Sequence, residues 1–241
     1  MKKIKYPTSP LLMVIAGLFA SVNLSAQTIA EYAFSGGSTA ATSSDANLTA
    51  GAWSVGTGLT GGAGASGSSN SLFARASVTH ASNQLSITNA LSDNDYLSVS
   101  FTPESGYEMN LTSLSFDLGY TRNGNFNGKQ FKAYLLSSAT GFVDASDILD
   151  SVTITVGANT STATYLGSLS ADLSGAEFQN ISSATEFRIY VADNTGNQNY
   201  LHRIDNVALN GSIASVVPEP SSFALIGGLL ALCSVMLRRR A

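Results

Sequence analysis

Carboxylates recur in close groups along the chain, and such groups are what glycoside hydrolysis requires. The groups are Asp93 with Asp95, Glu104 with Glu108, and Asp144 with Asp147 and Asp150. A glycosidase holds two carboxylates about 5 to 9.5 Å apart, and spacing in the sequence does not set that distance. Turn and surface roles account for these residues better than catalysis does, so none is assigned a catalytic role.

Histidine and cysteine are scarce, which narrows the possible chemistry further. His80 and His202 are the only histidines, and the single cysteine, Cys233, lies in an apolar run near the C-terminus. No serine lies in a recognisable nucleophile elbow, so no motif supports a hydrolytic triad. The middle of the chain holds no thiol, which excludes disulfides and cysteine-ligated zinc there. Cys233 is expected to act as a small apolar residue.

Oxygen ligands for calcium are more plentiful near residue 200. The side chains concerned are Asp193, Asn194, Asn197, Asn199, Asp205 and Asn206. Hard oxygen ligands suit Ca²⁺, but this spacing matches no calcium loop, and structural Asx turns are the favoured interpretation. We therefore assign no metal ligand and expect no cofactor.

One aromatic side chain could contact a sugar. Trp53 is the only tryptophan, and it lies at the edge of a segment rich in glycine, serine and threonine. A tryptophan in such a place can stack on a sugar ring, although a lone tryptophan in a β domain more often belongs to the core. The flanking segment, Gly36 to Ser71, is expected to form long loops, because it offers little apolar surface to offset the entropy of ordering.

The elements that would position these residues are strands. Several runs alternate apolar and polar residues with a period of two, and clusters of Gly, Asn and Asp separate them. The runs are Tyr96–Thr102, Leu111–Tyr120, Phe131–Leu135, Val152–Val156, Ala163–Leu169, Phe187–Val191 and Val207–Ile213. They predict an all-β domain of two packed antiparallel sheets, a jelly-roll-like sandwich. Ile204 and Val207 break the alternation, which predicts a bulge or bend at Asp205-Asn206.

Composition and charge exclude some partners. Of the 241 residues, 44% are hydrophobic and only 12% are charged. Between Gln27 and Val217 there are 15 acidic and six basic residues, a net charge of −9. This charge repels phosphate backbones, so we expect no binding to nucleic acid. The six basic residues are Arg75, Arg122, Lys129, Lys132, Arg188 and Arg203.

The N-terminus has the three parts of an export signal. Residues 1–26 contain a basic start, an apolar run from Leu11 to Ala20, and small polar residues that end at Ala26. The apolar run is too short for a membrane span, which needs about 20 residues. We expect cleavage after Ala26 by the export machinery, although Leu24 departs from the usual small residue three positions before the cut.

The C-terminus combines an open motif, an apolar run and a cationic end. The motif is Val217-Pro218-Glu219-Pro220, the apolar run extends from Phe223 to Leu237, and the end is Arg238, Arg239 and Arg240. Proline on both sides of Glu219 keeps that peptide extended. We expect the apolar run to form a transmembrane helix, and arginines on the cytoplasmic side place the middle of the chain outside. An ordinary tail anchor with a proline hinge is the alternative.

This tail, residues 215–241, resembles the bacterial PEP-CTERM sorting signal. The resemblance implies processing by an exosortase, a membrane-embedded cysteine peptidase of bacteria that make extracellular polysaccharide. It also implies that Pro218, Glu219 and Pro220 form the recognition element and that Arg238 to Arg240 hold the precursor in the membrane. The segments Glu186–Val191 and His202–Gly211 resemble the last two strands of jelly-roll ectodomains that often precede this signal.

Three segments are therefore expected: a signal peptide (1–26), an exported β-sandwich (27–214) and a sorting signal (215–241). The function expected is that of a cell-surface or extracellular-matrix protein, reached through an inner-membrane precursor, with a non-catalytic sandwich that binds extracellular polysaccharide. The alternative is a secreted polysaccharide-active enzyme on the same fold. The absence of a catalytic motif favours the first.

Overall fold

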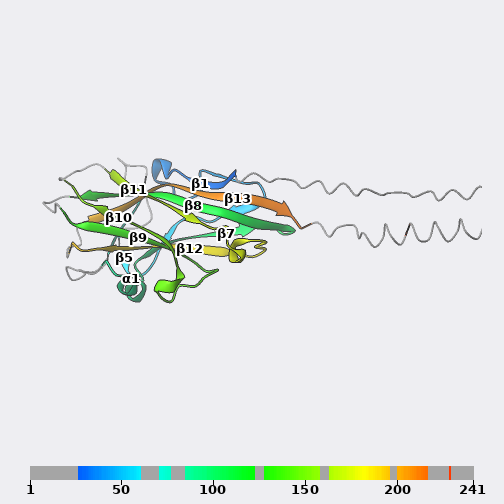
Figure 1. Cartoon of the computed structure of the whole chain (residues 1–241). Coiled ribbons are helices and arrows are strands. Elements are labelled where there is room, and N and C mark those ends of the chain that lie inside the picture. Colours follow the sequence, from blue (N-terminus) through cyan, green and yellow to red (C-terminus); the bar gives the residue numbers. More distant parts are fainter. Residues whose placement is uncertain are drawn as a thin grey trace, which may run out of the picture.

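The computed structural model describes residues 27–60, 71–76, 85–122, 128–157, 163–195, 200–216 and the single residue 228. In these residues the chain forms two antiparallel sheets that pack face to face, as expected for an all-β sandwich. Figure 1 shows the two sheets as layers, with the short helix α1 (Ile87–Asp93) on the outer side of the second layer.

The first sheet has the strand order β11-β8-β13-β1-β2, and β6 and β5 extend it beside β13. Its longest strands are β8 and β13, which run antiparallel to each other over most of their length. Its strands are β1 (Gln27–Tyr32), β2 (Ser43–Ser44), β5 (Leu59–Thr60), β6 (Leu72–Ala76), β8 (Tyr107–Arg122), β11 (Thr164–Asp172) and β13 (Tyr200–Ser215).

The second sheet has the order β10-β9-β12-β7-β3, and β4 also pairs with β7. Its strands are β3 (Leu48–Ala50), β4 (Ser54–Val55), β7 (Tyr96–Pro103), β9 (Gln130–Ser137), β10 (Ile148–Thr155) and β12 (Thr185–Asp193). Three single-turn 3-10 helices lie in connections, at η1 (Ser35–Gly37), η2 (Ala145–Asp147) and η3 (Ala176–Phe178).

The connections between the sheets follow the jelly-roll pattern. From β7 the chain crosses to β8 in the first sheet, returns for the β9–β10 hairpin, crosses to β11, returns to β12 and ends in β13. With β1 beside β13, the four-strand orders β1-β13-β8-β11 and β7-β12-β9-β10 are those of two interleaved Greek keys. The jelly-roll-like sandwich expected from the sequence is therefore confirmed.

The core lies between the sheets, and in the alternating strands every second residue points into it. In β8 the inward residues Leu114, Phe116, Leu118 and Tyr120 are all buried, as the period of two predicts. Phe187, Ile189 and Val191 of β12, in the second sheet, are buried in the same core. Each expected run of alternating residues corresponds to a strand of the structure.

The prediction that Gly36 to Ser71 forms only long loops is wrong for its described part. Strands β2 to β5 lie within it, and β3 and β4 pair with β7. Gly51 shows why glycine is needed here, because a Cβ atom would lie 2.9 Å from the carbonyl oxygen of Ser100. This glycine lets the backbone approach β7 closely enough for the Gly51 amide to donate to that oxygen at 2.8 Å.

The predicted irregularity at Asp205-Asn206 is confirmed as a β-bulge. Asp205 is opposite Asp117 and Ala208 is opposite Ser115, so two residues of β13 face one residue of β8. Asn206 has φ 51°, in the left-handed region. The extra residue restores the phase, so that Ile204 before the bulge and Val207 after it are both buried.

Among the described residues, no helix has the length and apolar character needed to cross a membrane. The expected transmembrane run from Phe223 to Leu237 lies outside them, apart from residue 228.

Candidate ligand-binding site on the second sheet

Several residues singled out in the sequence lie outside the described part of the chain. They are Ala26, His80, Asn197, Asn199, Val217, Pro218, Glu219, Pro220, Cys233, Arg238, Arg239 and Arg240. The signal peptide and the sorting tail therefore remain predictions from the sequence.

Trp53 belongs to the core, which confirms the interpretation that the sequence favoured and excludes the less favoured one, a sugar-stacking platform. Its side chain is 3% exposed and packs edge-on against Tyr32, with ring centroids 5.9 Å apart. Phe34 is a further neighbour, with ring centroids 6.5 Å away. A sugar ring cannot reach a side chain buried in this way.

His202 is also internal. It is 1% exposed, and its ring lies against Phe131 with centroids 4.6 Å apart. The other side of β13 carries Arg203, which is 2% exposed and donates from Nε to Thr121 Oγ1 at 2.8 Å. Burial lowers the pKa of Arg203. Both residues lie in the interior and offer no open reaction site.

Several of the carboxylates noted in the sequence serve local structure. Asp144 and Asp147 form a reciprocal capping box around η2. Glu104 Oε1 accepts from Thr49 Oγ1 at 2.6 Å. Asp150 Oδ1 accepts from the amide of Ser151 at 2.7 Å. Asp95 is 2% exposed beneath α1.

The four residues considered for calcium that the structure describes, Asp193, Asn194, Asp205 and Asn206, do not form one cluster. Asp193 Oδ1 accepts from the amide of Thr195 at 2.8 Å, which is an Asx turn. Asn194 Oδ1 accepts from the amide of Gln130 at 2.7 Å. Asp205 and Asn206 belong to the bulge of β13. Within the described residues, no three His, Cys, Asp or Glu side chains are placed to share a metal ion.

The outer face of the second sheet carries aromatic side chains where a solvated sheet would carry polar ones. Tyr134 of β9 and Tyr190 of β12 are register partners, and both are buried. They form a second, smaller apolar cluster with Ile87 and Ala90 of α1. Helix α1 therefore covers one part of this face and leaves the neighbouring part accessible.

Arg188 occupies that neighbouring part and is held on several sides. Its guanidinium carbon lies 4.3 Å from the ring centroid of Tyr96 and 4.0 Å from that of Phe142. Glu186 accepts from Nε at 2.8 Å and from Nη2 at 3.3 Å. The Tyr190 hydroxyl accepts from Nη1 at 3.3 Å. Arg188 is thus fixed between two rings and a carboxylate.

Two features show that Arg188 is a permanent, partly accessible donor. Burial lowers its pKa, but hydrogen bonds to Glu186 and Tyr190 and the charge of Glu186 outweigh that effect, so the pKa is raised. A guanidinium has five N–H groups, and three of them make the bonds above, which leaves two without a partner in the described part of the chain. The side chain is 22% exposed.

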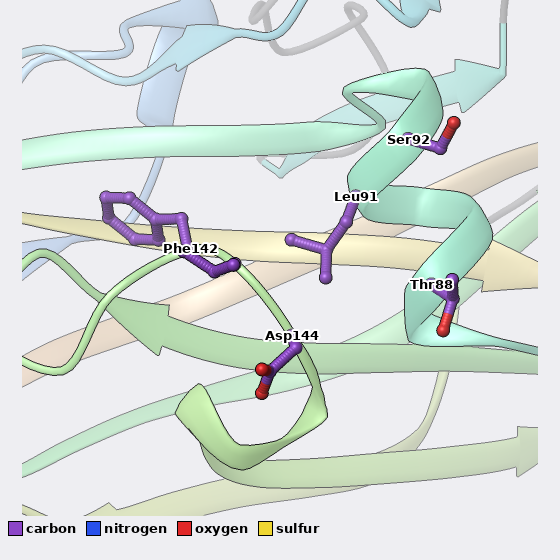
Figure 2. A pocket seen from close by; sticks show the side chains of 6 residues that line it. Thr88, Leu91, Ser92, Phe142 and Asp144 are labelled. Carbon is purple, nitrogen blue, oxygen red and sulfur yellow. The ribbon is translucent and has the colours of Figure 1, made fainter.

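A hollow is lined in part by Phe142, the residue whose ring contacts this arginine. It has a volume of about 340 Å³ and lies between α1 and the loop from β9 to β10. We call it the α1 hollow, and it is lined by Thr88, Leu91, Ser92, Phe142, Val143 and Asp144. Figure 2 shows Leu91 pointing from α1 toward the loop that carries Phe142 and Asp144.

The sequence contained a signal for this site. Tyr96, Tyr134 and Tyr190 stand in the phase of their strands opposite to the core residues, where exposed strands carry polar side chains. Aromatic residues in both phases indicate that the outer face is also covered or used. The contribution of Phe142 could not be foreseen, because it depends on the path of the β9–β10 loop.

Comparison with known proteins gives distant similarities only. No family model matches the chain, and no curated protein matches it. One similar solved structure is the mannan-recognising carbohydrate-binding module TmCBM27, with 12% identity, 69% of this chain and 89% of that chain covered, and a TM-score of 0.35. Another is the K3 adhesin domain of Lys-gingipain from Porphyromonas gingivalis W83, with 14% identity, 77% and 100% coverage, and a TM-score of 0.37. The K1 adhesin domain of the same protein has 14% identity, 77% and 97% coverage, and a TM-score of 0.32. These similarities are too distant to bear on the function of this chain.

Proposed function

We propose that this chain is an exported protein whose tail is processed by an exosortase and whose sandwich binds extracellular polysaccharide without cleaving it. The precursor is held in the inner membrane by the C-terminal apolar run and its arginines. The processed protein then belongs to the cell surface or the extracellular matrix.

The observation that carries the proposal is the pattern at the two ends of the sequence. An export signal ends at Ala26, and the tail contains Pro218-Glu219-Pro220, an apolar run and Arg238 to Arg240, in that order. Both ends independently predict that the middle of the chain lies outside the cytoplasm.

The strand pairing is compatible with processing at a membrane. Gln27, the first residue after the expected cleavage, is opposite Gly211, and β13 ends at Ser215. Because β1 and β13 are antiparallel neighbours, the signal peptide and the tail join the sandwich at the same end. One end of the domain can therefore face the membrane while both segments are removed.

A non-catalytic role is favoured by what the described carboxylates do. Asp144, Asp147 and Glu104 accept hydrogen bonds that shape turns and strand contacts. The accessible part of the second sheet instead offers a fixed guanidinium beside aromatic rings and a hollow. Planar polar groups next to aromatic surface suit a sugar, which has hydroxyls around its rim and C–H groups on its faces.

A retention assay with a measurement of cleavage tests the proposal for the sandwich. The chain from Gln27 onward, in a polyoxyethylene detergent, is passed over immobilised polysaccharides, and the eluate is assayed for new reducing ends. We expect retention with no increase in reducing ends. New reducing ends would show the alternative, a polysaccharide-active enzyme, and no retention on any polysaccharide would remove the binding role.

A further inference from the structure

The α1 hollow has the size of a small-molecule site. Its volume of about 340 Å³ is at the lower end of the range for ligand pockets, about 300 to 1,000 Å³. A space of this size holds roughly one or two sugar rings rather than a long chain segment. A polymer would therefore present a few of its units here and continue over the open face of the sheet.

The wall formed by the β9–β10 loop is apolar and unusually accessible. Val143 is 82% exposed, and it follows Phe142 at the rim of the hollow. Leu91 of α1 lines the hollow as well. Apolar side chains gathered around a hollow mark a surface that a ligand can cover favourably. The C–H face of a sugar ring is such a ligand surface.

The remaining lining groups can exchange hydrogen bonds with hydroxyls. Thr88 and Ser92 are four positions apart on α1, so their hydroxyls lie on one face of the helix. Asp144 lines the loop wall. Hydrogen bonds from the Ser146 hydroxyl and amide lower the pKa of Asp144, so its carboxylate is an ionised acceptor at neutral pH.

The charges around the hollow favour a neutral glycan over an acidic one. Asp144 is negative, and the charge of Arg188 is already balanced by Glu186. The segment between Gln27 and Val217 has a net charge of −9, which repels polyanions. The two N–H groups of Arg188 that lack a partner in the described residues can still donate to hydroxyl oxygens.

The side chain of Phe142 is also held in place before any ligand binds. Phe142 lies on the guanidinium of Arg188, which is itself bonded to Glu186 and Tyr190. A side chain held in this way loses little conformational entropy on binding. The same contact joins the hollow to the donor groups of Arg188.

We propose that the α1 hollow is the subsite that holds a neutral glycan, with the apolar lining of Leu91, Phe142 and Val143 against the sugar face and Asp144 bonded to its hydroxyls. This inference rests on the polysaccharide binding proposed above and adds its location and chemical class. Arg188 acts as a positioning residue for Phe142 and as a donor at the edge of the site.

Two matched pairs of variants test the location. Ser92→Trp places a large ring at the hollow, whereas Ser168→Trp makes the same change at an exposed position of β11 in the first sheet. Val143→Ser removes apolar surface at the rim, and Leu166→Ser removes it at another exposed position, where the leucine is 51% exposed. A melting curve of each variant by circular dichroism establishes that it is folded.

Binding is measured by affinity electrophoresis of the chain from Gln27 onward, in a polyoxyethylene detergent, because glycoside detergents would compete. The gels contain dextran, laminarin or galactan as neutral probes, and alginate or hyaluronate as acidic ones. We expect retardation by at least one neutral probe, a loss of affinity of about tenfold or more for Ser92→Trp, and less than about twofold for Ser168→Trp. Val143→Ser should weaken binding more than Leu166→Ser.

The outcomes separate this inference from the proposed function. If a neutral probe retards all four variants as it retards the unaltered chain, binding stands but the α1 hollow is not the site. Retardation by the acidic probes alone would overturn the proposal that the ligand is a neutral glycan. If no probe retards the unaltered chain, the proposed polysaccharide binding fails and this inference fails with it.

Discussion

Trp53 fills the space between the sheets against Tyr32 and Phe34, and its indole nitrogen has no hydrogen-bond partner within the described residues. The side chain therefore stabilises the fold through burial and at the same time leaves one donor unsatisfied. A buried donor without a partner costs about 1 to 3 kcal/mol. These two effects can be separated by substitution.

Trp53→Ala should lower the free energy of unfolding by about 3 to 5 kcal/mol, because it leaves a large cavity. Trp53→Phe should cost less than about half as much, because it keeps a ring and removes the unsatisfied donor. Urea denaturation of both variants measures the difference. An equal loss of unfolding free energy in the two variants would mean that the indole nitrogen makes a hydrogen bond. Polysaccharide retention should be unchanged in Trp53→Phe.

Asp205 is a residue whose charge opposes folding. Burial raises its pKa, and the facing carboxylate of Asp117 raises it further, against the lowering effect of hydrogen bonds from Asn206 and Tyr165. A carboxyl with a raised pKa in the folded state stabilises below its unfolded pKa and loses that contribution as pH rises through the folded pKa.

Asp205→Asn should therefore raise the melting temperature at pH 7, by an amount that corresponds to at most about 1 kcal/mol. The gain should vanish near pH 3, where Asp205 is protonated. Asp172→Asn is the control and should lower the melting temperature at pH 7, because hydrogen bonds from Ser174 lower the pKa of Asp172. A gain for Asp205→Asn that is the same at both pH values would contradict a charge effect.

At the scale of elements, the bulge of β13 sets the phase of the last strand. Asn206 has φ 51°, and its Nδ2 donates to Asp117 Oδ2 at 2.8 Å. Asn206→Gly keeps the left-handed conformation available, whereas Asn206→Val places a β-branched residue where it is strained. We expect Asn206→Val to cost about 1 to 3 kcal/mol more than Asn206→Gly in urea denaturation. Similar stability of the two variants would indicate that the bulge can move along the strand.

The long strands could be predicted because the alternate residues of each strand are buried in the core. Leu97, Val99 and Phe101 of β7 are all buried, and that is the pattern that periodicity detects. The bulge could be predicted for the same reason, since Ile204 and Val207 both needed to reach the core.

The short strands could not be predicted from periodicity. β2, β4 and β5 have two residues each, so their existence depends on backbone hydrogen bonds to distant strands. One such bond is from the Gly56 amide to the Tyr96 carbonyl oxygen, at 2.7 Å. The glycines of this segment suggested long loops, but they serve close packing, as at Gly58, where a Cβ atom would lie 2.0 Å from the carbonyl oxygen of Asp93.

The candidate site was largely invisible in the sequence for a related reason. Arg188, Tyr96 and Phe142 come from two strands and a loop, and only the sheet pairing and the loop path bring them together. The tyrosines in the outward phase were the available signal. The α1 hollow depends on a helix of seven residues, which carries little periodic information.

At the scale of the whole molecule, the described domain ends where the tail begins. β13 runs to Ser215, and the amide of Val216 donates to the Gly106 carbonyl oxygen at 2.8 Å. A chain from Gln27 to Val216 should therefore fold, with a cooperative melting curve by circular dichroism. A chain that ends at Asn210 should melt at a lower temperature, because it loses the pairing of Gly211–Ser215 with β8. Equal melting of the two chains, or an insoluble longer chain, would place the boundary elsewhere.

Sorting of the precursor is the central claim, and Glu219 is its most specific residue. We expect the carboxylate between Pro218 and Pro220 to lie on an extended backbone, and Glu219→Gln keeps its shape while removing its charge. We expect the arginines to act differently, through the cost of moving three charges into hydrocarbon. Replacing Arg238, Arg239 and Arg240 with Ser should therefore reduce membrane retention of the precursor.

The most direct measurement is an immunoblot of membrane and medium fractions from a host that carries the cognate exosortase. Glu219→Gln is compared with Glu177→Gln, which removes a charge at an exposed position of the sandwich. We predict uncleaved, membrane-bound precursor for Glu219→Gln and normal maturation for Glu177→Gln. Maturation of Glu219→Gln at the normal rate would contradict the claim and leave the tail as an ordinary anchor with a proline hinge.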